Sequence, residues 1–135
     1  MNKELTLDAK KENLDNVLEF LDNSLDELGC PMKAKIKLDI CVEELFVNIA
    51  SYAYPSGTGK AVIRIESGDT SSVTLTFIDS GTPYNPLARQ DPNTHASAEE
   101  RDIGGLGILI VKKSVDEISY RYENGNNILT FRKNL

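Results

Sequence analysis

The spacing of apolar residues changes along this chain, and the order of those changes limits the folds it can adopt. Between residues 9 and 28 apolar side chains recur every three or four positions, which is the repeat of an amphipathic helix. A second helical segment follows from about Pro31 to Ala53, and Gly29 with Pro31 separates the two. We therefore expect two helices in the first part of the chain.

Beyond residue 59 apolar residues mostly alternate with polar ones, as they do in strands that bury one face. This alternation, with a shorter example near the start of the chain, predicts strands at 3–8, 60–67, 72–79, 117–123 and 127–133. The turn residues at 68–70 and 124–126 join consecutive strands as hairpins.

One further helix is expected over residues 104–116, which open with glycines and continue as an apolar run. Helices therefore come first, followed by strands with one helix among them. That order predicts an α+β fold, a two-layer sandwich with helices on one face of a mostly antiparallel sheet. The length of 135 residues suits one domain that spans 1–135.

The composition argues against several classes of function. The formal net charge is −6, whereas a nucleic-acid-binding surface needs a basic footprint, so we expect no direct nucleic-acid contact. The longest apolar run, LGILIV, is too short to span a bilayer. The first residues, MNKELTLDAKKEN, hold no apolar signal core, so we expect a cytoplasmic protein without a membrane partner.

A metal site built from cysteine and histidine is not expected. The cysteines are Cys30 and Cys41, which form no CxxC pair, and His95 is the only histidine. We expect two reduced and partly buried thiols.

Glu44 and Asn48 are the first candidate functional residues. They lie four positions apart in the second helix and therefore share one of its faces. A carboxylate can act as a general base, and an amide oxygen can ligate Mg²⁺. The structural alternative is a solvated Glu44 and an Asn48 bonded to a neighbouring loop. Glu43 is the adjacent carboxylate, about 100° round the helix.

Asp79 and Gly81 end an apolar strand in the segment IDSGTP. An ionised carboxylate accepts hydrogen bonds only, and adenine offers an amino donor where guanine offers an acceptor. A buried Asp79 would thus favour adenine, and Gly81 would let the backbone approach the flat base. The same residue types also build plain turns.

Gly104, Gly105 and Gly107 open the last predicted helix, where free backbone amides can bind phosphate. A flexible helix entry is the alternative explanation of these glycines. Before them, residues 84–103 show no period, and a patternless stretch of that length is typical of a functional lid or a disordered loop.

Taken together, these motifs resemble the GHKL (Bergerat-fold) ATP-binding family, and most of all its small anti-sigma factor serine/threonine kinases. The segments that carry the resemblance are ELFVNIASYAYP, IDSGTPYNPL and DIGGLGILIVKKSVDEISYRYENGNNILTFRK. The resemblance covers essentially the whole chain.

The resemblance implies a role for each motif, with ATP and Mg²⁺ as cofactors. Asn48 corresponds to the Mg²⁺ ligand, Glu44 to the general base, and Asp79 to the adenine reader with Gly81 beside the base. The second glycine box near the phosphates corresponds to Gly104, Gly105, Leu106 and Gly107, and the ATP lid to residues 87–103.

Two contacts of the family have no certain counterpart in this chain. Arg101 is the candidate for a basic lid residue near the phosphates, and Arg89 or Lys112 could serve instead. The family often places a threonine of the last strand near the adenine, where this chain has Asn127.

The activity implied is that of an anti-sigma factor kinase, which phosphorylates a serine of an anti-anti-sigma (STAS-type) partner, releases it and then sequesters a sigma factor. Members of this branch are commonly homodimers. One alternative is an ATP-binding module that switches partners without significant phosphotransfer. A stand-alone ATPase is a further alternative, but its relatives carry added domains that are missing here.

Overall fold

The structure is a computed structural model that describes residues 1–55, 57–69, 71–88 and 105–135, for residues 105 and 106 without their side chains. Its helices and strands are, in chain order, β1 Asn2–Asp8, α1 Leu14–Glu27, α2 Met32–Tyr52, β2 Lys60–Glu66, β3 Ser72–Asp79, α3 Gly105–Ser114, β4 Glu117–Glu123 and β5 Asn126–Asn134. Two 3-10 turns, η1 Lys11–Asn13 and η2 Pro86–Ala88, complete the described elements.

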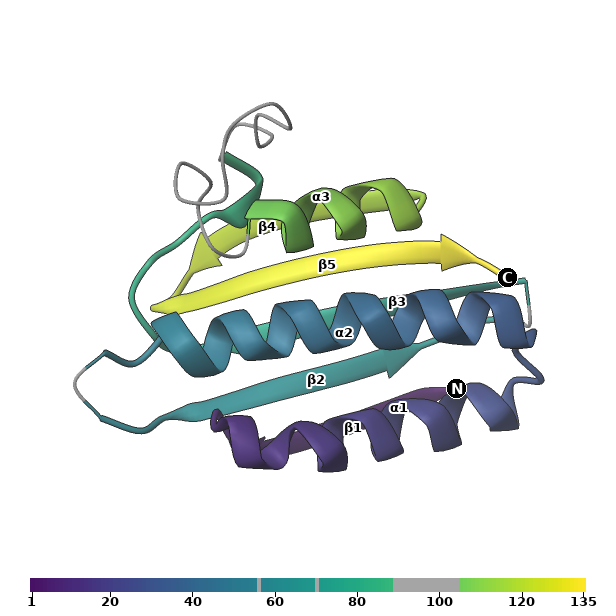
Figure 1. Cartoon of the computed structure of the whole chain (residues 1–135), viewed down its shortest axis with the longest axis horizontal. Helices are drawn as coiled ribbons and strands as arrows, with labels where there is room; N and C mark the ends of the chain where they lie inside the picture. Colours follow the sequence, from purple (N-terminus) through teal and green to yellow (C-terminus); the bar gives the residue numbers. More distant parts are fainter. Residues whose placement is uncertain (56, 70, 89–104) are drawn as a thin grey trace.

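The strands form one sheet in the order β1-β2-β3-β5-β4, and every neighbouring pair is antiparallel. Helices α1, α2 and α3 lie on the same face of this sheet, with α2 between α1 and α3 (Figure 1). The predicted two-layer α+β sandwich is therefore confirmed. None of the described helices is long and apolar enough to cross a membrane.

The first helix begins later than the spacing of apolar residues predicts. The amide of Ala9 donates to the carbonyl of Gly59 at 2.8 Å, so the pairing of β1 with β2 continues one residue beyond Asp8. The buried side chain of Ala9 thus belongs to the end of the sheet. A single 3-10 turn then reverses the chain, and α1 starts at Leu14.

The hairpin between β4 and β5 follows the predicted turn. Asn124 and Gly125 both have positive φ, at 54° and 80°, as a two-residue type I′ turn requires. Asparagine and glycine are the residues that adopt this conformation most readily. The turn fixes the register of β4 against β5, in which Tyr122 stands opposite Asn127. On its other side β5 pairs with β3, and there Asn127 stands directly opposite Asp79.

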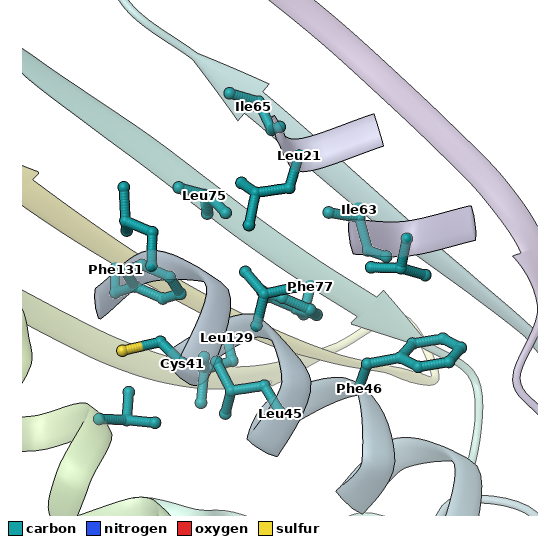
Figure 2. Packing of buried hydrophobic residues seen from close by; sticks show 14 of the residues in the cluster. Leu21, Cys41, Leu45, Phe46, Ile63, Ile65, Leu75, Phe77, Leu129 and Phe131 are labelled. Carbon is teal, nitrogen blue, oxygen red and sulfur yellow. The ribbon is translucent and has the colours of Figure 1, made fainter. Parts of the chain in front are cut away.

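The core fills the space between the helices and the covered face of the sheet. Figure 2 shows side chains from α1, α2 and the strands meeting in one cluster. The rings of Phe77 and Phe131 stack, with 6.3 Å between their centroids. The largest fully buried side chains are Phe46, Phe77, Phe131, Leu21, Leu25, Leu38, Ile63, Ile65, Leu75, Val17, Val42 and Val73.

Two aspartates face each other where α1 packs beside α2. One oxygen of each carboxyl, Oδ1 of Asp22 and of Asp39, is buried and has no hydrogen-bond partner among the described residues. Burial, followed by the adjacent Asp22 carboxyl, raises the pKa of Asp39 to about 7, and nearby Lys35 opposes the shift. Lys35 itself pairs with Asp26 at 3.0 Å. Below about pH 7 the folded protein therefore keeps Asp39 protonated beside Asp22, whereas an unfolded chain would release that proton.

This shared proton predicts a pH-dependent stability. Because folding raises the pKa of Asp39, its contribution is complete below the ordinary aspartate pKa and is lost as the pH rises through about 7. The amide introduced by Asp39→Asn can donate to Asp22 without that proton. Between pH 6 and 8 wild type should lose about 1 kcal/mol more stability than Asp39→Asn, a small value because solvent reaches part of the pair.

Melting temperatures measured by circular dichroism from pH 5.5 to 8.5 test this expectation. Asp15→Asn is the matched control, since Asp15 is an exposed aspartate of α1. Parallel pH curves for wild type and Asp39→Asn would contradict the shared proton.

Candidate functional site

A cleft opens between the second half of α2 and the ends of β3, β4 and β5. Its walls are largely apolar, and a few polar side chains open into it, as in most small-molecule sites. The polar lining includes Asn48, Asp79 and Asn127, and the apolar lining includes Leu45, Ile49 and Phe77. Two residues predicted from separate motifs, Asn48 and Asp79, thus line the same cleft.

The α2 wall of the cleft carries Asn48, and Glu44 lies one turn earlier. Asn48 is half-buried, and its side chain makes no hydrogen bond to any residue that the structure describes. Among the described residues, therefore, no neighbouring loop bonds to the Asn48 amide, as the structural alternative would require. Within the described part of the chain, the side-chain amide of Asn48 is available to a ligand in the cleft.

The carboxylate of Glu44 lies against the first turn of α3. A Cβ atom added to Gly107 would be 2.0 Å from Glu44 Oε2, so a side chain at position 107 would displace this carboxylate from its place. Glu44 is half-buried, whereas Glu43 is exposed. The structure thus brings Glu44 together with the glycine turn, although Gly107 follows it by 63 positions in the sequence.

Asp79 ends β3 and is buried at the floor of the cleft. Its Oδ1 accepts two hydrogen bonds, from the amide of Gly81 and from Asn127 Nδ2, each at 2.9 Å. No hydrogen bond from the described part of the chain reaches the other oxygen, Oδ2. A ligand that offers a donor can therefore meet Asp79 at Oδ2.

Gly81 is required by packing against the end of α2. A Cβ at this position would be 2.2 Å from the carbonyl oxygen of Ala53. The next amide, that of Thr82, donates to the same carbonyl at 2.8 Å. The sequence predicts that Gly81 lets the backbone approach a ligand closely. The structure shows that Gly81 also approaches the end of α2 closely, a contact that no local sequence signal indicates.

Tyr54 joins the same regions through its hydroxyl. The hydroxyl donates to the carbonyl of Lys60 at 2.6 Å and accepts from the amide of Ser80 at 2.8 Å. The segment after α2 is thereby tied to the starts of β2 and of the loop after β3. Sequence reasoning did not single out Tyr54, because a contact across the fold has no local signature.

Only part of the predicted glycine box lies among the described residues. Gly105 begins α3, and the backbone of Leu106 and Gly107 continues its first turn. Lys112 lies in the last turn of α3, at the end away from these glycines. Gly104, Arg101, Arg89 and His95 fall outside the described residues, as does the predicted lid beyond residue 88.

No group of three or more His, Cys, Asp or Glu side chains that could hold a metal ion occurs within the described ranges. Among these residues, Asn48 on the α2 wall could supply one oxygen to a divalent ion, and a ligand would bring others. An amide oxygen joined by phosphate oxygens and water is a donor set that suits Mg²⁺.

The fold and cleft define a two-layer α+β domain with a largely apolar cleft between one helix and the ends of an antiparallel sheet. The profile of the histidine kinase-like ATPase domain matches residues 7–133. The chain belongs to this family, which is the GHKL family that its motifs resemble.

A named relative supports a kinase-like, ATP-binding role. Over 98 residues the chain is 26% identical to the serine/threonine-protein kinase BtrW of Bordetella bronchiseptica, and the match covers 73% of this chain and 69% of that protein.

Two solved structures share the fold. The RsbU and RsbW domains of Rv1364c from Mycobacterium tuberculosis align with a TM-score of 0.70 at 17% identity, over 98% of this chain and 32% of that one. The mycobacterial sensor histidine kinase MprB aligns with a TM-score of 0.55 at 18% identity, over 96% of this chain and 97% of that one. This chain therefore spans about a third of the Rv1364c structure and nearly all of the MprB structure.

The contact between Gly81 and Ala53 leads to a stability prediction. Gly81→Ala should destabilise the fold by about 2–3 kcal/mol, because the new methyl group meets a backbone carbonyl that cannot turn away. Urea unfolding followed by circular dichroism measures the change. Gly68→Ala is the control, since a Cβ there has no atom within 4 Å, and it should change stability by less than about 0.5 kcal/mol. Equal stability of the two variants would show that the loop after β3 moves freely on α2.

Proposed function

We propose that this chain is an anti-sigma factor serine/threonine kinase. It binds Mg-ATP in the cleft and transfers the γ-phosphoryl group to a serine of an anti-anti-sigma (STAS-type) partner. The observation that carries the proposal is the position of Glu44, whose carboxylate lies against Gly107 one helical turn from Asn48 in the cleft wall. A module that only binds nucleotide has no need of a carboxylate at that place.

Asp79 would recognise the adenine base. Its Oδ2 is an acceptor in a largely apolar cleft, and the amino group of adenine is the matching donor. The apolar walls, among them Ile49 and Phe77, suit the faces of a base.

Asn48 fits the part of a Mg²⁺ ligand, because its amide lines the cleft and makes no bond to the described residues. When bound, the ion would neutralise phosphate charge during transfer. The first turn of α3, with Gly105 and Gly107, would offer backbone amides to the phosphates. Arg101 would add a positive charge from the lid.

In the transfer step Glu44 would accept the proton of the attacking serine hydroxyl. The serine oxygen forms a bond to the γ-phosphorus while the bond to the bridging oxygen breaks, and its electron pair leaves with ADP. The phosphoserine carries nearly two negative charges at neutral pH, which would weaken the hold of this acidic kinase on its product. The freed kinase would then bind its sigma factor.

The proposal includes a homodimer and a cytoplasmic location. The likeness to BtrW, a serine/threonine-protein kinase, supports the kinase part of the proposal.

The first test is Glu44→Gln, which keeps the size of the side chain and removes the base. With γ-labelled ATP, Mg²⁺ and a candidate STAS-type protein, label transfer should fall by about 10²–10⁴-fold. ADP affinity measured by calorimetry should stay within about twofold, because Glu44 is not among the residues that line the cleft.

Glu43→Gln is the matched control, since Glu43 is exposed and lies on a different face of α2, and it should transfer label as wild type does. Label transfer undiminished in Glu44→Gln would reject Glu44 as the base. Nucleotide binding and complex formation without any transfer by wild type would leave the partner-switch module as the function.

A second test is Asp79→Asn. The new side chain can still accept the bonds from Gly81 and Asn127, but it presents a donor where Asp79 presents Oδ2. ADP binding should weaken by about 1.5–3 kcal/mol, the value of a hydrogen bond to a charged group. Calorimetry that finds unchanged ADP affinity would remove Asp79 from the adenine site.

A further inference from the structure

We propose that Asn127 sets the base selectivity of the cleft as a positioning residue, by holding Asp79 with one oxygen turned to the ligand. The inference rests on the proposed function, because it takes the ligand to be an adenine nucleotide. Asn127 is buried, lines the cleft and stands directly opposite Asp79 in the pairing of β3 with β5.

Both amide hydrogens of Asn127 are committed to the loop that forms the cleft floor. Nδ2 donates to Asp79 Oδ1 at 2.9 Å and to the carbonyl of Thr82 at 3.0 Å. An asparagine amide has two hydrogens to donate, so neither is left for a ligand.

The amide oxygen of Asn127 is committed as well. It accepts from the amide of Tyr84 at 3.1 Å and from the hydroxyl of Tyr120 at 2.5 Å. Burial, together with the nearby charge of Asp79, raises the pKa of Tyr120, so its hydroxyl keeps the proton that it donates. An asparagine turned the other way would point its hydrogens at the Tyr84 N–H, so the surrounding groups fix its orientation.

With all four bonding directions in use, Asn127 can reach a base directly only by breaking a bond within the fold. Its effect on a ligand must therefore pass through Asp79. Oδ1 of Asp79 is filled by Asn127 and by the amide of Gly81, and rotation of the carboxylate is restrained by both. The cleft floor thus offers Oδ2 as an acceptor and no donor from Asn127. That pattern accepts the amino group of adenine and rejects the carbonyl oxygen that guanine has in its place.

Asn127 could instead do no more than hold the loop from Thr82 to Tyr84 in place. A loosened loop would weaken the binding of every purine nucleotide to a similar degree. A misplaced Asp79 carboxylate would weaken adenine binding and spare guanine binding. The ratio of ADP to GDP affinity therefore separates the two roles.

The test measures ADP and GDP dissociation constants by calorimetry for wild type and Asn127→Asp. This change keeps the shape of the side chain and its acceptor for Tyr84 and Tyr120, but it replaces the donor to Asp79 with a second carboxylate oxygen. At pH 8 ADP should bind about 10-fold more weakly and GDP within about threefold of wild type. At pH 6 part of the ADP affinity should return, because a proton shared by the two carboxylates restores the missing donor.

Two further variants complete the design. Asn127→Thr keeps a hydroxyl donor and should retain most of the ADP preference, and it serves as the test variant if Asn127→Asp does not fold. Asn126→Ala is the matched control. Asn126 is the neighbouring asparagine, accepts a hydrogen bond from Ser80 Oγ at 2.7 Å and does not line the cleft, so its removal should leave the ratio unchanged.

Each outcome decides between the proposals. Equal losses of ADP and GDP affinity in Asn127→Asp, or no loss in either, would overturn the positioning role and leave the proposed function intact. Wild type that binds neither nucleotide would overturn the proposed function and the inference together. A further loss of ADP affinity when Asn127→Asp is added to an Asp79→Asn background would show that Asn127 acts without Asp79, and would also overturn the positioning role.

Discussion

Burial of one face of α2 against the sheet is the interaction on which the rest of the molecule depends. Leu38, Val42, Leu45 and Phe46 lie on this face and are buried in the core. Because a helix repeats every 3.6 residues, seating these positions on the sheet turns Asn48 toward the cleft and Glu44 toward α3. The hydrophobic effect thereby fixes the direction of two polar side chains that contribute little to the core themselves.

A second constraint acts at the end of the sheet, where β3 and β5 pair. Their register sets Asp79 opposite Asn127, and the loop after β3 docks onto Ala53 at the end of α2. Buried polar groups are costly unless bonded, and here each one is bonded to the next. Within the described residues the cleft floor is consequently one connected set of hydrogen bonds, with a single carboxylate oxygen of Asp79 left over for a ligand.

These two constraints assign different tasks to the two sides of the cleft. In the proposed function the sheet side carries the hydrogen-bonded polar floor, which would distinguish one base from another. The helix side carries Asn48 and Glu44, whose side chains make no hydrogen bond to the described residues and which, in the proposed function, would act on the phosphate groups and the attacking hydroxyl. Such a division suits phosphoryl transfer, in which positioning and charge stabilisation do most of the work.

The sequence by itself determined the α+β class, the strands and helices to within a few residues, the hairpin at Asn124 and Gly125, and two of the residues that line the cleft, Asn48 and Asp79. It could do so because helical period, strand alternation and turn preference are local properties of a chain. The start of α1 was misjudged because the backbone bond of Ala9 to Gly59 is not local. Only the tertiary structure decided that Gly107 makes room for Glu44, that Gly81 packs on Ala53, and that Asn127 holds Asp79. Each of these contacts joins segments far apart in the chain, and their geometry follows from how helices and strands pack.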